Sequence, residues 1–134
     1  MKTIEAEARS TGSPQAVWAL LEDASRWTQW GSWSKVHVEG GGAQRPGAVR
    51  VLHRRPFKVR ERITEWVPGE RMGYELLDGM NVTGYRSTVT IDPAADGSVV
   101  RWRSTYDSAG LLTGLILRAA VPDSCKRVAQ AAGR

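Results

Sequence analysis

Residues 110–131 read Gly-Leu-Leu-Thr-Gly-Leu-Ile-Leu-Arg-Ala-Ala-Val-Pro-Asp-Ser-Cys-Lys-Arg-Val-Ala-Gln-Ala, the longest apolar segment of the chain with helical spacing. Within it, Leu112, Leu115, Ile116 and Ala119 recur at intervals that place side chains on one face of an α-helix. Residues 48–106 instead contain segments typical of strands. One apolar helix after a series of strands predicts an α+β fold in which the helix packs against a sheet.

The interior proline of this segment, Pro122, is the weak point of the predicted helix. Proline inside a helix removes a backbone hydrogen bond and costs about 3 kcal/mol, so it usually kinks or interrupts the helix. We therefore expect either a kink or two pieces, Gly110–Val121 and Asp123–Ala132.

The N-terminal part predicts one strand followed by two short helices. Residues 3–10 alternate apolar and polar side chains, as a half-buried strand does. Ser13 is a suitable N-cap and Pro14 a suitable first residue for a helix, and a second short helix is expected over Arg26–Trp30. Further strands are predicted at Val36–Glu39, Ala48–His53, Lys58–Trp66, Arg71–Leu77, Val82–Pro93 and Ser98–Tyr106.

Composition is that of an ordinary globular protein. The 134 residues, 41% hydrophobic and 25% charged, indicate a single domain over residues 1–134. No run reaches the roughly 18 apolar residues of a membrane span, and the first residues lack the apolar core of a signal peptide. With Cys125 as the single cysteine, we expect a cytoplasmic protein, monomeric or homodimeric, in which this thiol is a small buried residue.

The net charge of +5 and a pI near 9.9 raise the question of nucleic acid. Lys58, Arg60 and Arg62 would share one strand face, either as a solvated outer surface or as a phosphate-binding stripe. Because the other basic residues are spread along the chain, we favour the solvated surface and do not expect a nucleic-acid partner.

Two motifs carry a family resemblance. The first is Ser-Pro-Gln-Ala-Val-Trp-Ala-Leu-Leu-Glu-Asp at residues 13–23, followed by Trp27 and Trp30; the second is Val-Arg-Glu-Arg-Ile-Thr-Glu-Trp-Val-Pro at residues 59–68, followed by Tyr74. In these motifs and in the order of its elements the chain resembles the helix-grip superfamily of START-type and pollen-allergen-type domains (SRPBCC). Within that superfamily it is most similar to the polyketide cyclase/dehydrase and lipid-transport group.

The resemblance implies a strongly curved antiparallel sheet that grips the long C-terminal helix, with a cavity between the two and the short helices closing one end. Members of the group mostly bind small hydrophobic molecules, and only some of them are enzymes.

Strand alternation assigns the side chains that would face such a cavity. Placing Arg101 and Arg103 outside turns Trp102, Ser104 and Tyr106 inward, and placing Lys58, Arg60 and Arg62 outside turns Glu61 and Glu65 inward. The same aromatic residues could equally fill a solid core. The candidate ligand-binding residues are Trp30, Trp33, Ile63, Met72, Tyr74, Tyr85, Trp102, Tyr106, Leu112, Leu115, Ile116 and Ala119.

An inward carboxylate at Glu61 allows three interpretations. It is a polar anchor or general acid/base in the cavity, a group at the open end that is solvated or bonded to a tyrosine or tryptophan, or a sign that a bulge shifts the register. For a cyclase/dehydrase-type enzyme the candidate catalytic residues are Glu61, Tyr85 and Ser104.

Other catalytic patterns are absent from the sequence. His37 and His53 have no ligand-spaced partner, so we expect no metal, and no nucleotide-binding motif predicts a cofactor. We therefore expect a module that binds a small hydrophobic or aromatic ligand, with the enzyme as the alternative and a basic interaction surface as a lesser one.

Overall fold

The computed structural model describes all residues from Met1 to Arg134 and contains a seven-stranded sheet in which every neighbouring pair is antiparallel. Its strands, in spatial order, are β1 (Lys2–Ser10), β8 (Gly97–Tyr106), β7 (Arg86–Ala94), β5 (Arg71–Asp78), β4 (Phe57–Val67), β3 (Val49–Arg54) and β2 (Lys35–Val38). The helices are α1 (Pro14–Glu22), a 3₁₀ turn (Ala24–Arg26), α2 (Trp27–Trp30) and α3 (Leu111–Ala132). Two short strands, β6 (Val82–Thr83) and β9 (Ser108–Ala109), form a separate two-stranded sheet, and β9 leads into the start of α3.

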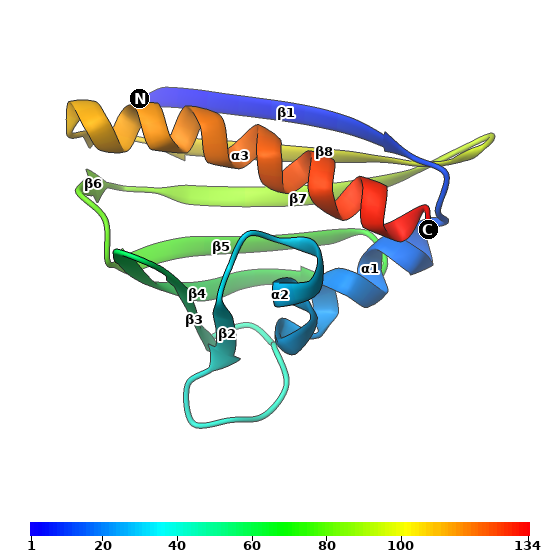
Figure 1. Cartoon of the computed structure of the whole chain (residues 1–134), viewed down its shortest axis with the longest axis horizontal. Helices are drawn as coiled ribbons and strands as arrows, with labels where there is room; N and C mark the ends of the chain where they lie inside the picture. The colour runs from blue at the N-terminus through cyan, green and yellow to red at the C-terminus, as the bar shows by residue number, and fades with distance from the viewer.

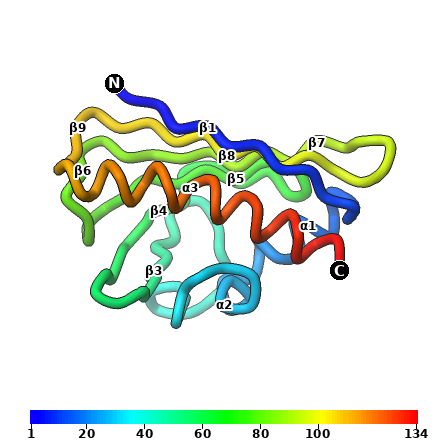
Figure 2. Tube along the Cα trace, turned by 45° about the horizontal axis from the view of Figure 1, so that its top comes forward, coloured from blue at the N-terminus to red at the C-terminus, as the bar shows by residue number.

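The long helix α3 runs along one face of the sheet, and α1 supports its C-terminal end (Figures 1 and 2). It packs chiefly on β1, β8 and α1. Ser13 caps α1 by accepting a hydrogen bond from the Ala16 N–H at 3.1 Å, and Pro14 occupies the first helical position. The predicted α+β fold, with a C-terminal helix on an antiparallel sheet and short helices after the first strand, is confirmed.

The division of α3 at Pro122 is wrong, because the helix is continuous over Leu111–Ala132. Pro122 lies on the exposed side of α3. Water can therefore reach the Arg118 carbonyl, which lacks its usual backbone donor four residues later. The lost backbone hydrogen bond therefore costs little, and packing against the sheet keeps the helix continuous through Pro122.

The predicted inner face of α3 is also wrong in part. Leu112 and Leu115 are 70% and 58% exposed, whereas the buried side includes Leu117, Val121 and Cys125. The first half of α3 has apolar residues on all sides, so its sequence is compatible with several buried faces. The second half has few apolar residues, and only one of its faces can be buried. That face sets the rotation of the whole helix.

Two irregularities alter the predicted strands. The predicted strand Val82–Pro93 is divided at Gly84, whose φ of +67° lies in the region that favours glycine. In β4 the register shifts between Ile63 and Glu65, so Glu65 is exposed and pairs with Arg71 instead of facing inward.

No helix in the structure combines the length and the apolar character that crossing a bilayer requires.

Candidate functional site

A cavity of about 580 Å³ lies between α3 and the strands β3, β4, β5 and β8, with Tyr85 just before β7. Of the 21 residues that line it, 15 are hydrophobic. From α3 come Ile116, Leu117 and Val121, and the opposite wall includes Tyr74 and Trp102. The cavity forms because the sheet bends toward the helix, and because small residues, such as Ala120, occupy the facing positions on α3.

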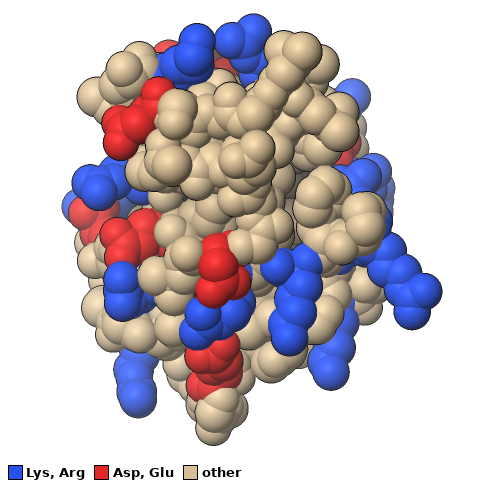
Figure 3. Space-filling view, turned by 90° about the vertical axis from the view of Figure 1, so that its left-hand side faces the viewer, with Lys and Arg blue, Asp and Glu red and all other residues tan.

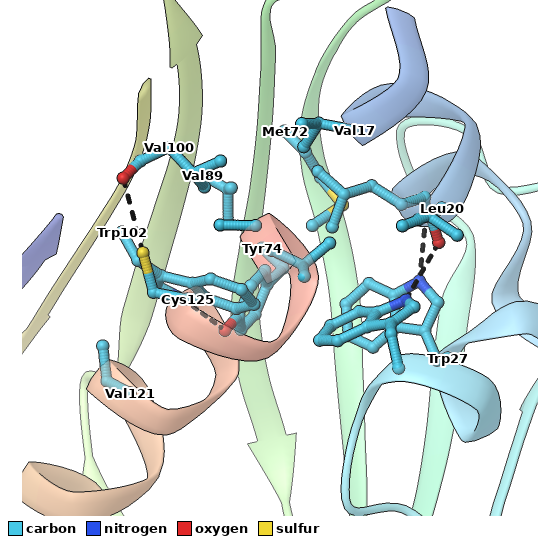
Figure 4. Packing of buried hydrophobic residues seen from close by; sticks show 14 of the residues in the cluster. Val17, Leu20, Trp27, Met72, Tyr74, Val89, Val100, Trp102, Val121 and Cys125 are labelled. Carbon is cyan, nitrogen blue, oxygen red and sulfur yellow. Dashed lines mark hydrogen bonds between the residues drawn. The ribbon is translucent and has the colours of Figure 1, made fainter. Parts of the chain in front are cut away.

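Aromatic hydroxyls and ring N–H groups form a buried network along the sheet wall. Trp102 Nε1 donates a hydrogen bond to the Tyr74 hydroxyl at 3.2 Å (Figure 4). The Tyr85 hydroxyl donates to Ser104 Oγ at 3.1 Å, and Ser104 lies 2.6 Å from Ser87 Oγ. Burial raises the pKa of both Tyr74 and Tyr85. The cavity therefore presents these tyrosines as neutral hydroxyl groups at physiological pH.

A buried ion pair lies behind this wall. Arg50 is completely buried, and its Nη2 and Nε donate to Glu61 Oε1 at 2.7 and 3.2 Å. The guanidinium carbon stands 4.0 Å from the ring centroid of Trp27 and 4.9 Å from that of Tyr74. Arg50 Nη1 also donates to Gln44 Oε1 at 2.8 Å. A buried charge needs partners of this kind, because desolvation otherwise outweighs its attractions.

Glu61 is the member of the pair that reaches the cavity. Its side chain is 10% exposed, and the residue lines the cavity. Burial raises the pKa of Glu61, and the charge and hydrogen bonds of Arg50 oppose that rise. Of the three interpretations of Glu61, the structure agrees with an inward side chain in the cavity wall. The register of β4 shifts between Arg60 and Glu61, as the third interpretation expected, and again between Ile63 and Glu65. Glu61 nevertheless faces the cavity.

The structure brings together only part of the predicted site. The predicted ligand-binding residues that line the cavity are Trp33, Tyr74, Tyr85, Trp102, Ile116 and Ala119. Of the catalytic candidates, Glu61 and Tyr85 line it, while Ser104 is buried behind Tyr85. That any of them binds or acts on a ligand stays a prediction.

The remaining predicted residues lie elsewhere. Trp30, Ile63, Met72 and Tyr106 are buried but belong to the packed core and do not line the cavity. Trp30, for example, donates its Nε1 hydrogen to the Leu20 carbonyl at 3.1 Å. Leu112 and Leu115 are exposed, as described above, because α3 is rotated relative to the predicted face. Alternation identifies which side chains point inward, but it does not show whether such a side chain is packed in the core or borders a cavity.

Sequence reasoning missed several lining residues, among them Leu52, Phe57 and Met80, and it missed Arg50 behind them. A signal for Arg50 was present. The two strands predicted around Arg55 and Pro56 form a hairpin, and its register places Arg50 directly opposite Glu61. Opposite charges at facing positions indicate a cross-strand pair.

Charged groups surround the cavity rather than fill it. Arg54 and Arg55 are exposed, line the cavity and form no ion pair, whereas Arg127 pairs with Asp123 at 2.8 Å. Figure 3 shows the end of the molecule that carries β6 and the start of α3, where a broad uncharged area has charged side chains of both signs around it.

The basic outer face of the sheet is largely occupied by ion pairs. Arg60 pairs with Glu39 and Asp78, both at 2.6 Å, and Arg62 pairs with Glu75 at 2.7 Å. On β8, Arg101 pairs with Glu7 and Asp92, and Arg103 pairs with Glu5. A face of alternating signs matches the predicted solvated surface better than a phosphate-binding stripe.

Neither the two histidines nor the single cysteine lines the cavity. His37 and His53 stack with ring centroids 5.6 Å apart, but no cluster of three metal-ligating side chains exists. Cys125 is buried, donates to the Val100 carbonyl at 3.4 Å (Figure 4) and has a pKa raised by burial to about 11. Its thiol therefore stays protonated at neutral pH, as expected for a structural residue and not for a nucleophile.

Known structures share this fold. XoxI from Bacillus cereus superposes with a TM-score of 0.76 and 23% identity, covering 97% of this chain and 93% of that chain. A protein from Thermobifida fusca gives a TM-score of 0.75 and 24% identity, covering 93% and 85%. DynU16, a protein of the dynemicin biosynthetic locus, gives 0.78 and 14%, covering 96% of this chain and 46% of that one. At these identities the likeness is one of fold.

Sequence comparison identifies the family. None of the curated proteins matches this chain. The family model for polyketide cyclase / dehydrase and lipid transport, however, matches residues 1–132. The match spans the N-terminal helix motif, the central hairpin and the C-terminal helix, and the last two contribute residues to the cavity wall. The chain therefore belongs to the polyketide cyclase/dehydrase and lipid transport family.

Proposed function

We propose that this protein binds a small hydrophobic or aromatic ligand in the cavity between α3 and the sheet. The observation that carries the proposal is the cavity itself, about 580 Å³ and lined mostly by hydrophobic side chains. Cavities of about 300–1,000 Å³ with apolar walls and a few polar groups are typical of small-molecule sites. Family membership supports the same role, since the family description includes lipid transport.

Binding is tested by titrating the protein with an apolar fluorescent probe and following the quenching of tryptophan fluorescence. Trp33 and Trp102 line the cavity, so a bound probe should quench them. Ala120→Phe, which places a ring in the cavity, should abolish binding. Arg118→Phe, which places the same ring on the exposed side of α3, is the matched control and should bind normally. Equal binding by both variants would show that the probe does not enter the cavity.

A cyclase/dehydrase-type activity is the second candidate. It is favoured by the presence of a carboxylate, Glu61, and a neutral hydroxyl, Tyr85, in the same largely apolar cavity. Such chemistry requires little more than a shaped cavity and one or two groups that transfer protons. Here Glu61→Gln should abolish turnover of a polyketide-like substrate while the cavity still takes up an apolar analogue. Undiminished turnover by this variant would exclude the assignment.

A further inference from the structure

We propose that the buried wall of the cavity recognises a hydroxyl group, with Glu61 as its acceptor and Tyr74 as its donor, so that the ligand is an apolar molecule bearing a hydroxyl, such as a phenol. This inference rests on the proposed function, because it names the ligand class of the same cavity.

The first step concerns the two oxygens of Glu61. Both hydrogen bonds from Arg50 go to Oε1, and no protein group donates to Oε2. Oε2 is not among the fully buried polar atoms that lack a hydrogen-bond partner, so it remains accessible. Since Glu61 lines the cavity, Oε2 is an open acceptor on its wall. An unpaired carboxylate oxygen in an apolar environment is costly unless a ligand or water donates to it.

The second step concerns how rigidly that oxygen is held. Arg50 Nη1 donates to Gln44 Oε1, and Gln44 Nε2 donates to the Leu21 and Glu22 carbonyls at 2.9 and 2.7 Å. The Arg50 guanidinium is thereby fixed to the end of α1 and, through Trp27, to α2. Arginine stays protonated in proteins, so Arg50 needs a negative charge beside it. It acts as a positioning residue that holds Glu61 as a carboxylate, which can only accept hydrogen bonds.

The third step adds a donor beside this acceptor. In the sheet, Glu61 faces Leu76 across β4 and β5, and Tyr74 lies two residues further along β5 on the same side. The Tyr74 hydroxyl accepts from Trp102. The hydroxyls of Ser87 and Tyr85 lie near it and affect its pKa, but both are hydrogen-bonded to Ser104, which leaves the Tyr74 proton available to a ligand. A ligand hydroxyl both donates and accepts, so it can satisfy Glu61 and Tyr74 together. A pure hydrocarbon would leave both unpaired, and hydrogen bonds to charged groups make that difference about 10–100-fold in affinity.

Calorimetric titration with 2-naphthol and naphthalene tests the inference, since the two probes share one ring system and differ by one hydroxyl. The wild-type protein should bind 2-naphthol about 10–100-fold more tightly. Glu61→Gln should remove most of this preference and leave the affinity for naphthalene nearly unchanged. Glu75→Gln is the matched control, because it removes a carboxylate on the same sheet that pairs with Arg62 outside the cavity.

Two further variants keep the test decisive if Glu61→Gln unfolds. Arg50→Met combined with Glu61→Gln leaves no unpaired arginine charge in the core. Tyr74→Phe removes only the donor hydroxyl. Each of these variants should reduce the preference for 2-naphthol. Equal wild-type affinity for the two probes would overturn the hydroxyl site and leave the proposed ligand binding intact. Binding of neither probe would overturn both.

Discussion

Arg50 joins four parts of the molecule through one side chain. It pairs with Glu61 on β4, bonds Gln44 ahead of β3, stacks on Trp27 of α2 and contacts the sulfur of Met72 on β5 at 3.5 Å. A buried ion pair contributes little net stability, since hydrophobic residues of similar size at such positions often give an equally or more stable protein. What the pair adds is a fixed carboxylate at the cavity.

Single replacements in this pair should be far more harmful than the double replacement. Arg50→Met or Glu61→Leu alone should lower the free energy of unfolding by about 3–5 kcal/mol, because each leaves an uncompensated buried group. Arg50→Met with Glu61→Leu should recover most of that loss. Urea unfolding of the four proteins measures the coupling. Additive losses in the double variant would mean that the two side chains act independently.

Cys125 provides a pH-dependent prediction. Burial raises the pKa of its thiol from 9.0 to about 11. Between these values the unfolded thiol loses its proton first, so the folded state binds more protons and the free energy of unfolding falls as pH rises. Cys125→Ala should lack this contribution. Urea unfolding of both proteins at pH 8 to 11 tests this. Above pH 9 the free energy of unfolding of the wild type should fall relative to that of the variant. A constant difference would contradict the buried, protonated thiol.

At the scale of elements, α3 shows packing overriding local preference. The helix continues through Pro122, and the exposed Leu112 and Leu115 lie beside a buried stripe that the sheet and α1 select. The strand divided at Gly84 and the bulge before Glu65 have the same origin. Each permits a neighbouring element to pack, and neither is marked strongly in the local sequence.

Pro122→Ala should stabilise the protein. A helix interior favours alanine over proline by about 3 kcal/mol, and part of that gain is offset because proline also restricts the unfolded chain. Pro122 is exposed, so no packing is lost. We expect a gain of roughly 1–2 kcal/mol by thermal or urea unfolding. Pro68→Ala, at the end of β4 outside any helix, is the control and should give no such gain. A loss at Pro122 would mean that the proline is needed for a bend in α3.

At the scale of the whole molecule, the cavity separates α3 from the β3–β4 hairpin over part of its length. Occupying it should therefore stabilise the fold. A ligand at 100 times its dissociation constant should add about 2.7 kcal/mol to the free energy of unfolding, seen as a higher Tm. In Ala120→Phe the same ligand should leave the Tm unchanged. A Tm shift of equal size in that variant would place the ligand elsewhere.

Part of the site was predictable because alternation along the strands holds except at the bulge that turns Glu65 outward. Tyr74, Tyr85, Trp102 and Glu61 all face the interior, as their period-two pattern indicates. The pattern could not distinguish core from cavity, so Met72 and Tyr106 were grouped with the cavity although they are packed. That distinction depends on how far the opposing helix stands from each position.

The sequence alone determined the fold class, the cap of α1, the order of the elements and the family motifs, because these depend on local spacing and on which residues favour turns, caps and strands. Only the tertiary structure decided the rotation of α3, its continuity through Pro122, and which inward residues border an empty space. It also decided that Arg50 neutralises Glu61 from behind and leaves one carboxylate oxygen toward the cavity. These features arise from long-range packing, in which many small contact energies outweigh the preference of any single residue.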